Sequence, residues 1–378
     1  MTASVASVAS VASVAIGAGG AGGGRGRPFP GIVDRWVHPG VSSDPLSSLS
    51  TRAEALPVIV VAGEVLVDLV VRADGVVDAR LGGGPYNTAR TLARLGAPTT
   101  FFGGLADDRF GRLLRRALDA EGVAIGVPGP SAAPTTLALV DLDQAGVASY
   151  AFYLTGTAAA DLDYPPLAAA FAAILAQARA AVAVHVGALG LVMEPIGSAV
   201  ERLVLADVPP DALVMLDPNC RPGAIADRAA YLGRIGRIAA RADVVKASVD
   251  DLAYLYPGST AAEAAELLLA GGSALVLVTD GPRPARGFLP GAVLAVEVPA
   301  VDVVDTIGAG DAFGGGFLAW WSANGLTRSD LKRPPLVRTA VQAAAAVSAA
   351  TCGRPGADPP TLAELQAGHA WPPPGAHR

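Results

Sequence analysis

The sequence is poor in the residues on which several kinds of catalysis depend. It has two cysteines and four histidines in 378 residues. Cys220 and Cys352 lack the spacing of a metal site and are too few for a disulfide framework, which indicates a reducing cytosol. His38, His369 and His377 fall in the expected terminal tails. A histidine base or a multi-histidine metal site is therefore not expected, and carboxylates, backbone amides and basic side chains remain for any chemistry.

Charge is also scarce, because only 16% of the residues are charged. Lysine and arginine number 28 against 34 acidic residues, a net charge of −6. Nucleic acid and anionic membranes need a basic surface, so neither is expected as a partner. Hydrophobic residues make up 52% of the chain, enough for a large core, and the length allows one large α/β domain or two smaller ones.

Residues 1–56 differ from the rest in composition, with Val-Ala-Ser repeats followed by glycine-rich and serine-rich stretches. No charged segment precedes the apolar part, which argues against a secretory signal, and the run is too short and too serine-rich to span a membrane. Gly17, Gly19 and Gly22 fit the pattern G-x-G-x-x-G, but "GGRGRPFPG" follows and cannot open a helix. We expect a disordered low-complexity extension over 1–56 and a short tail over 366–378.

From residue 57 onward, strand and helix patterns alternate. Apolar β-branched runs predict strands at 57–71, 99–106, 181–189, 212–219, 243–248 and 274–281. Helical spacing lies between them, and two further helices are predicted at 311–323 and 335–351. This order predicts an α/β fold with a mainly parallel sheet covered by helices on both faces. The segments 66–82 and 135–154 break the alternation and predict a small antiparallel sheet beside the main body.

Polar residues follow several of the predicted strands. Ligands of open α/β sheets bind beyond the carboxyl ends of the strands, so we expect these residues to gather at one edge. They are Asp68, Asp217–Asn219, Lys246–Ser248, Thr279–Gly281, and Asp305 after "VDVV".

A glycine turn, Gly308-Ala309-Gly310, leads into the helix predicted from residue 311. Such a turn presents unpaired N–H groups and the positive end of the helix dipole, which suits a phosphate or a developing anion. Asp311 has two interpretations: a residue that satisfies the helix terminus, or a base that takes a proton from a hydroxyl attacking a bound phosphoryl group. The sequence contains no P-loop and no His-Arg-Asp kinase signature, and Phe313 occupies the place of the third Rossmann glycine.

A second glycine cluster lies in "LGGGPYNTARTLARLG", residues 81–96. Three glycines at a strand exit allow a small polyol to lie against the backbone. Asn87 supplies both a donor and an acceptor near a helix start. An ordinary loop with an asparagine near a helix N-terminus remains the alternative.

These segments together resemble a known family. "DTIGAGDAF" is similar to the C-terminal signature of the ribokinase-like (PfkB) carbohydrate kinases, and "GGGPYNTARTLARLG" resembles their N-terminal signature. The resemblance covers about 57–365, which we expect to form the kinase domain. It implies a three-layer α/β/α sandwich with a small β-sheet lid, made of strands near 66–82 and 135–154. It also implies phosphorylation of a sugar hydroxyl by ATP with Mg²⁺, in a cytoplasmic homodimer joined through the lid.

The resemblance also implies roles for individual residues. Asp311 would be the catalytic base, with an anion hole formed by the amides of Gly308, Ala309 and Gly310. The sugar would contact Asp68, Gly83, Gly84 and Asn87, with Asn219 and Arg221 as further substrate or phosphate contacts. The nucleotide site would comprise Lys246, Ser248, Thr279 and Gly281. Asp305, with the loop 352–356, resembles the monovalent-cation site of the family, which would take K⁺.

Two stretches depart from the family pattern. "KASVDDL" stands where the family has Asn-x-x-Glu, so Ser248 and Asp251 would organise Mg²⁺ through water, and the choice between Asp250 and Asp251 stays open. Serine and aspartate oxygens suit Mg²⁺. "TDGPRPARG" replaces the usual Thr-x-Gly-x-x-Gly and retains only Thr279 and Gly281 of its pattern.

The acceptor sugar has several candidates. "GEVLVDL", "GGGPYN" and "DPNCRP" look most like bacterial fructokinases and 2-keto-3-deoxygluconate kinases. Arg221 can pair with the carboxylate of a sugar acid, so a sugar acid, a pentose or a nucleoside remains an alternative to fructose. A catalytically silent sugar- or nucleotide-binding regulator is the alternative of another class.

Overall fold

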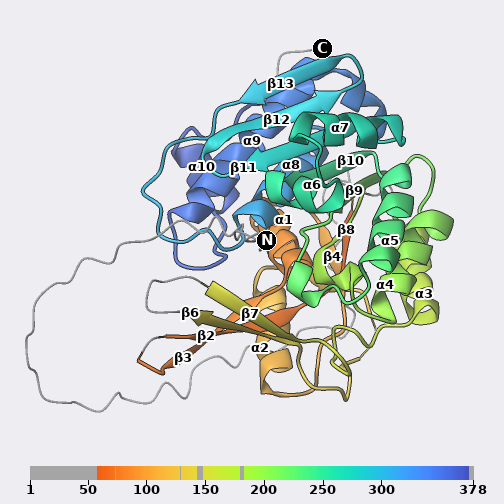
Figure 1. The fold of residues 1–378 in the computed structure, drawn as a ribbon, viewed down its shortest axis with the longest axis vertical. Coiled ribbons are helices and arrows are strands. Elements are labelled where there is room, and N and C mark those ends of the chain that lie inside the picture. Colours follow the sequence, from red (N-terminus) through yellow and green to blue (C-terminus); the bar gives the residue numbers. More distant parts are fainter. Residues whose placement is uncertain (1–57, 73, 128, 143–147, 179–182, 374–378) are drawn as a thin grey trace, which may run out of the picture.

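The computed structural model describes residues 58–72, 74–127, 129–142, 148–178 and 183–373 (Figure 1). The predicted extension over residues 1–56 lies outside the described residues. So do residues 374–378 of the predicted tail.

Nine strands form the main sheet. Their order is β13-β12-β11-β10-β9-β8-β1-β4-β5. All neighbours from β5 to β11 pair in parallel, whereas β12 and β13 are added antiparallel at one edge. The strands are β1 (Ile59–Ala62), β4 (Thr99–Phe102), β5 (Ala124–Ile125), β8 (Ala183–Gly187), β9 (Leu213–Asp217), β10 (Val244–Ser248), β11 (Leu275–Asp280), β12 (Arg283–Leu289) and β13 (Ala292–Val296). The mainly parallel sheet predicted from the sequence is confirmed.

Helices cover both faces of this sheet, as β1 illustrates. Val60 and Ala62 belong to one hydrophobic core, and Ile59 and Val61 belong to the other, because alternate side chains of a strand point to opposite faces. The first core is covered by α3 (Tyr164–Gln177), α4 (Ile196–Arg202), α5 (Arg228–Arg241), α6 (Val249–Leu255) and α7 (Ala261–Ala270). The second is covered by α1 (Gly84–Arg94), α2 (Arg109–Ala120), α8 (Ala309–Ala323), α9 (Pro334–Cys352) and α10 (Leu362–Ala367). The fold is the expected three-layer α/β/α sandwich.

No helix in the described part of the chain is both long enough and apolar enough to cross a membrane.

A separate sheet of four strands forms the predicted lid, and its strands lie together below the main body in Figure 1. The order is β3 (Val77–Gly82), β2 (Leu66–Val71), β6 (Leu137–Leu142) and β7 (Ala148–Tyr153). The two outer pairs are antiparallel, but the central pair, β2 with β6, is parallel. The expectation of an entirely antiparallel sheet was therefore wrong at its centre. The hairpin β2–β3 and the hairpin β6–β7 are far apart in sequence, and they join through the parallel pairing of β2 with β6.

The pattern of the apolar run 57–71 predicted a single strand, but the structure has two strands there. β1 ends at Ala62 in the main sheet, and β2 begins at Leu66 in the lid. Gly63 makes the crossing with a φ of 154°, and a side chain there would meet Pro85 at 2.4 Å. Because residues on both sides of the crossing are buried, the hydrophobic pattern gives no sign of it. Asp68 therefore lies within a lid strand and does not end a strand of the main sheet.

The strand predicted at "VDVV", residues 301–304, is also absent from the structure. Val301, Val303 and Val304 are 40%, 49% and 48% exposed, so this β-branched run lies in a surface segment. Asp305 is instead positioned by the end of α9, because the N–H groups of Val304 and Asp305 donate to the carbonyl of Cys352 at 2.8 and 3.2 Å.

The sequence did not predict strands β12 and β13 or helices α3, α6 and α10. In β12, Arg283, Pro284 and Arg286 interrupt the apolar alternation, so the segment looks like a loop. β12 nevertheless pairs with β11, which lies in the core.

Gly315 and Gly316 allow α8 to pack closely between α1 and α9. A Cβ at Gly315 would lie 2.7 Å from the side chain of Thr91 in α1, and one at Gly316 would lie 3.1 Å from the backbone of Ala344 in α9. Contacts below 3 Å to a buried β-branched side chain leave no room for a larger residue. The close packing brings the N-terminus of α8 beside α1.

Candidate active site

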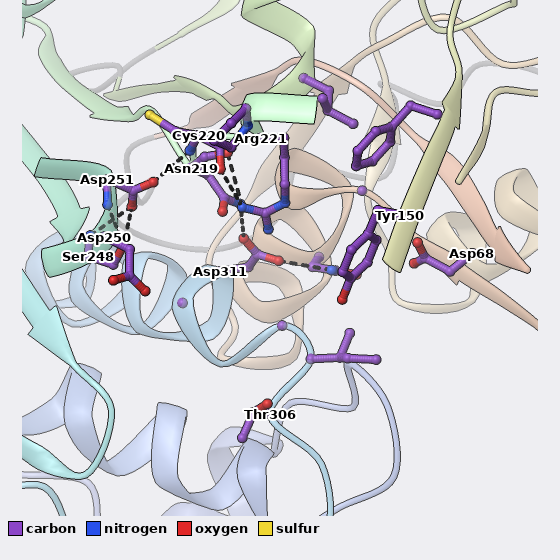
Figure 2. A pocket seen from close by; sticks show the side chains of 18 of the residues that line it. Asp68, Tyr150, Asn219, Cys220, Arg221, Ser248, Asp250, Asp251, Thr306 and Asp311 are labelled. Atoms are coloured by element: carbon purple, nitrogen blue, oxygen red, sulfur yellow. Dashed lines mark hydrogen bonds between the residues drawn. The ribbon is translucent and has the colours of Figure 1, made fainter. Parts of the chain in front are cut away.

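A cleft of about 760 Å³ lies between the lid and the carboxyl ends of the main-sheet strands (Figure 2). It collects most of the residues that the sequence singled out. Those that line it are Asp68, Gly83, Asn87, Asn219, Arg221, Ser248, Asp251, Gly308, Gly310 and Asp311. In Figure 2, Asp311 lies between Asp68 at one end of the cleft and Ser248, Asp250 and Asp251 at the other.

The other predicted residues do not line the cleft. Gly84 adjoins it, since a Cβ there would lie 3.3 Å from Asp311 Oδ1. Thr279 is the register partner of Ser248 on the neighbouring strand, and Gly281, with a φ of 55°, makes the turn from β11 to β12. Ala309 is part of the glycine turn, Lys246 Nζ lies 2.8 Å from the place of a Cβ on Gly310, and Asp305 accepts the N–H of Ile307 just before the turn. The structure thus groups the sugar candidates closely and the nucleotide candidates more loosely.

Asp311 is held by two amide side chains. Asn87 Nδ2 donates to Oδ2 at 2.9 Å, and Asn219 Nδ2 donates to Oδ1 at 3.4 Å. The carboxylate caps no backbone N–H of its own helix among the described residues, so helix capping does not explain it. Asp311 is 7% exposed, and burial raises its pKa above the ordinary value, while the Asn87 hydrogen bond and the charges of Lys246 and Arg221 act in the opposite direction.

Asn87, which lines the cleft, has a second polar atom that is not used by Asp311. Its Oδ1 is buried and has no hydrogen-bond partner among the described residues. A buried acceptor without a partner is costly, and a ligand hydroxyl would satisfy it.

The glycine turn leaves backbone amides open. Gly308 has a φ of 76°, in the left-handed region, and a Cβ there would lie 2.5 Å from that of Ala357. The Ala309 N–H donates to the Thr306 carbonyl at 3.3 Å. The next N–H groups, of Gly310 and Asp311, belong to the first turn of α8 and have no acceptor within the helix. These amides can receive an anion.

Lys246 adds a buried positive charge beside this turn. Its Nζ lies 2.8 Å from Asp217 Oδ2 and 2.8 Å from the place of a Cβ on Gly310. Burial lowers its pKa, but Asp217 and Asp251 more than offset this, so the pKa is raised and the ammonium stays charged.

Asp68 and Arg221 both line the cleft, and their charges interact. Burial raises the pKa of Asp68 to about 6, although Arg221 lowers it. Arg221 is exposed, and its guanidinium donates to the carbonyls of Asn219 and Cys220 at 3.3 and 3.1 Å. The lid adds an aromatic wall, because the rings of Tyr150 and Phe152 stack with centroids 6.1 Å apart and both line the cleft.

Glu64 is a residue of the site that sequence reasoning missed. Its Oε1 accepts the N–H of Gly84 at 3.0 Å, and its Oε2 accepts the N–H of Gly190 at 2.7 Å. Burial raises its pKa to about 7. A glutamate inside an apolar run was the available signal, since a buried carboxylate needs such partners. It ties the start of α1 to the segment after β8.

The acidic end of the cleft has two neighbouring aspartates in different roles. Asp251 Oδ2 accepts the N–H and Oγ of Ser248 at 2.8 and 2.7 Å, and Oδ1 accepts the Cys220 N–H at 2.6 Å. Asp250 is exposed and makes no hydrogen bond or ion pair with another described residue. Within the described ranges no group of three or more histidine, cysteine or acidic side chains could hold a metal alone. Water-mediated binding of Mg²⁺ fits the exposed Asp250 carboxylate, whereas both oxygens of Asp251 already accept hydrogen bonds from the protein.

Asp305 is bound by donors from three separate segments. Oδ1 accepts the Ile307 N–H at 3.0 Å. Oδ2 accepts the Gly356 N–H at 2.9 Å and Nη1 of Arg80 at 2.9 Å. Arg80 belongs to lid strand β3 and was not singled out by the sequence.

With this geometry in hand, the chain can be compared with known proteins. Residues 58–364 match the model of the pfkB family carbohydrate kinases. A fructokinase of Rhizobium leguminosarum bv. trifolii is 37% identical over 269 residues, which cover 69% of this chain and 78% of that protein.

Three of the solved structures with the same fold are fructokinases. A fructokinase of Vibrio cholerae O395 with fructose, ADP and calcium is 27% identical, with a TM-score of 0.71 over 82% of this chain and 98% of that one. A double mutant of that enzyme holds fructose, ADP and potassium. A fructokinase of Xylella fastidiosa with bound ATP is 28% identical, with a TM-score of 0.74 over 82% and 97% of the two chains.

The implied ribokinase-like fold is thus confirmed, and enzymatic phosphorylation replaces the silent regulator as the interpretation of the site. The chain belongs to the pfkB family of carbohydrate kinases and is an ATP-dependent sugar kinase.

Proposed function

We propose that this kinase phosphorylates fructose, with Asp311 as the general base. The observation that carries the proposal is the position of the Asp311 carboxylate. It is buried, held by Asn87 and Asn219, and it lies in the first turn of α8, where the Gly310 and Asp311 N–H groups have no acceptor within the helix. A base and an anion site side by side are what transfer of a phosphoryl group to a hydroxyl requires.

The reaction follows from these positions. A sugar hydroxyl donates its proton to Asp311 while its oxygen forms a bond to the γ-phosphorus of ATP. The bond from this phosphorus to the bridging oxygen breaks, and ADP leaves. Negative charge on the transferred oxygens faces the N–H groups at Gly308–Gly310, and the nearby Lys246 ammonium adds positive potential. The proton on Asp311 is released to solvent after the product leaves.

The charges of the cleft favour a neutral polyol over a sugar acid. Four aspartates line it, Asp68, Asp250, Asp251 and Asp311, and the one lysine or arginine among the lining residues is Arg221, since Lys246 is buried and paired with Asp217. A sugar carboxylate would meet like charges, which costs free energy in a partly buried site. Ionised Asp68 and the free Oδ1 of Asn87 can accept hydroxyl hydrogens, and Gly83 and Gly84 allow the sugar close to the backbone. The fructokinase names of the relatives agree with this choice.

The opposite end of the cleft takes ATP and Mg²⁺ in this proposal. Ser248 lines this end of the cleft, and Thr279 and Gly281, on the neighbouring strand and in the turn after it, would contact the nucleotide beyond it. Asp250, with Asp251 beside it, would hold Mg²⁺ through water. Mg²⁺ neutralises charge on the phosphate oxygens.

We assign the kinase domain to 57–365 and propose that two chains pair through their lids in the cytoplasm. Strand alternation puts Val77, Ala79, Ala151 and Tyr153 on the lid face turned away from the cleft. Val77 and Tyr153 are 52% and 57% exposed. An apolar sheet face of this kind needs cover.

Light scattering should give the mass of two chains. A monomer mass at assay concentrations would exclude the proposed dimer.

A sugar panel tests the proposed substrate. With Mg-ATP and K⁺, the purified protein should release ADP with fructose far faster than with glucose, a pentose, a nucleoside or 2-keto-3-deoxygluconate. A faster reaction with the sugar acid would mean that Arg221 outweighs the carboxylates. If every sugar fails while a sugar or ATP still raises the Tm, the protein binds without catalysing.

Asp311→Asn should lower kcat by about 10²–10⁴-fold, the usual contribution of a general base, and leave ATP affinity unchanged in calorimetry. Gly314→Ala, on the same helix, is the matched control, because its new Cβ would be 3.6 Å from the nearest atom, Met215 Cε, an ordinary contact. A kcat of Asp311→Asn within a few-fold of wild type would contradict the base role.

The pKa of Asp68, raised to about 6 by burial, predicts an acid limb in the KM for the sugar. As the pH falls through 6, Asp68 gains a proton and accepts fewer hydroxyl hydrogens, so KM should rise about tenfold between pH 7 and pH 5. In Asp68→Asn, KM should be high and flat over this range. A wild-type KM that does not change with pH would exclude ionised Asp68 as a sugar ligand.

A further inference from the structure

Asp305 forms an ion pair with an arginine side chain of the lid. The Arg80 guanidinium lies 2.9 Å from Asp305 Oδ2, and the two residues are 225 positions apart. Their side chains are 41% and 19% exposed. A pair this exposed is partly screened by water, so it can form and break as the lid moves.

Asp305 stands at the junction of two segments that support the glycine turn. It accepts N–H groups from Ile307, just before the turn, and from Gly356. The segment around Gly356 also touches the turn directly, since a Cβ at Gly308 would be 2.5 Å from that of Ala357. The position of Asp305 therefore fixes the backbone that leads to the amides at Gly308–Gly310.

Arg80 links this junction to the sugar end of the cleft. Arg80 and Asp68 are direct cross-strand partners in β3 and β2, so both side chains lie on the same face of the lid. The hairpin β2–β3 thus carries both Asp68, which is proposed to contact the sugar, and Arg80, which pairs with Asp305.

The family resemblance assigns a monovalent-cation site to Asp305 and residues 352–356, and a related fructokinase has been solved with potassium. The Asp305 side chain of this protein does not fit that ion. One oxygen is shared by an N–H and a guanidinium, and the other accepts an N–H. A K⁺ ion at the same carboxylate would be repelled by the arginine at short range.

We propose that Arg80 takes the place of the monovalent cation at Asp305 and so couples closure of the lid over the sugar to the order of the Gly308–Gly310 amides. Arg80 is then a positioning residue that acts through Asp305. The proposal rests on the function proposed above for that turn.

The experiment compares wild type, Arg80→Ala and Arg72→Ala in potassium chloride and in tetramethylammonium chloride of equal concentration. Arg72 is the matched control, a lid arginine near Asp74 and Asp78 (3.8 and 3.5 Å). The wild type and Arg72→Ala should have the same kcat in both salts. Arg80→Ala should lose about tenfold in kcat in tetramethylammonium, the scale of a charged hydrogen bond, and regain part of it with K⁺ or guanidinium.

A second readout does not depend on turnover. Crystals soaked in rubidium chloride should have an anomalous peak beside Asp305 in Arg80→Ala and none there in wild type. Strong K⁺ activation of the wild type with rubidium bound at Asp305 would overturn the proposal. So would an Arg80→Ala variant that matches Arg72→Ala, or one whose loss no cation restores. If no sugar is phosphorylated by any variant, the proposed function fails, while the rubidium result still decides the role of Arg80.

Discussion

The buried carboxylate of Asp311 is the constraint on which the rest of the site depends. A carboxylate removed from water tends to hold its proton, yet a base must be ionised before it acts. Asn87 and the positive charges of Lys246 and Arg221 counter the effect of burial on its pKa. Each comes from a different element: α1, β10 and the segment after β9. The sandwich must therefore bring three distant parts of the chain to the N-terminus of α8, and the glycines of α8 permit that approach.

The lid has to meet a different requirement. The sugar must enter from water and then lie in a site with little water. The chain meets this by leaving the main sheet at Gly63, so that Asp68 and the stacked pair Tyr150 and Phe152 sit on a separate sheet over the cleft. Glu64, next to the crossing, holds the backbone of Gly84. The crossing from the main sheet to the lid at Gly63 and the glycines proposed to contact the sugar are thus held by neighbouring residues.

The sequence could predict what repeats or what is local. The βα alternation predicted the parallel sheet, which the structure confirms, because periodicity depends on nearby residues. The glycine turn at 308–310 predicts an anion site in the same local way, and that site stays a prediction. It could not predict the break between β1 and β2, since both sides are buried, nor the strand β12, whose arginines and proline hide its pairing with β11. Arg80 and Glu64 were missed for a related reason. Their roles depend on partners such as Asp305 and Gly190, more than a hundred residues away.

The same argument explains why each glycine motif was ambiguous alone. Asp311 could have been a helix cap, and Asn87 could have been an ordinary loop residue. The hydrogen bond between them, across 224 positions, favours a shared site over both alternatives, because both residues line the same cleft. Each motif supplies one partner of this hydrogen bond, and the bond forms only in the folded chain. Two motifs in the right order therefore identify the fold far more specifically than either motif alone. Only a fold that packs α1 against α8 brings Asn87 and Asp311 into contact.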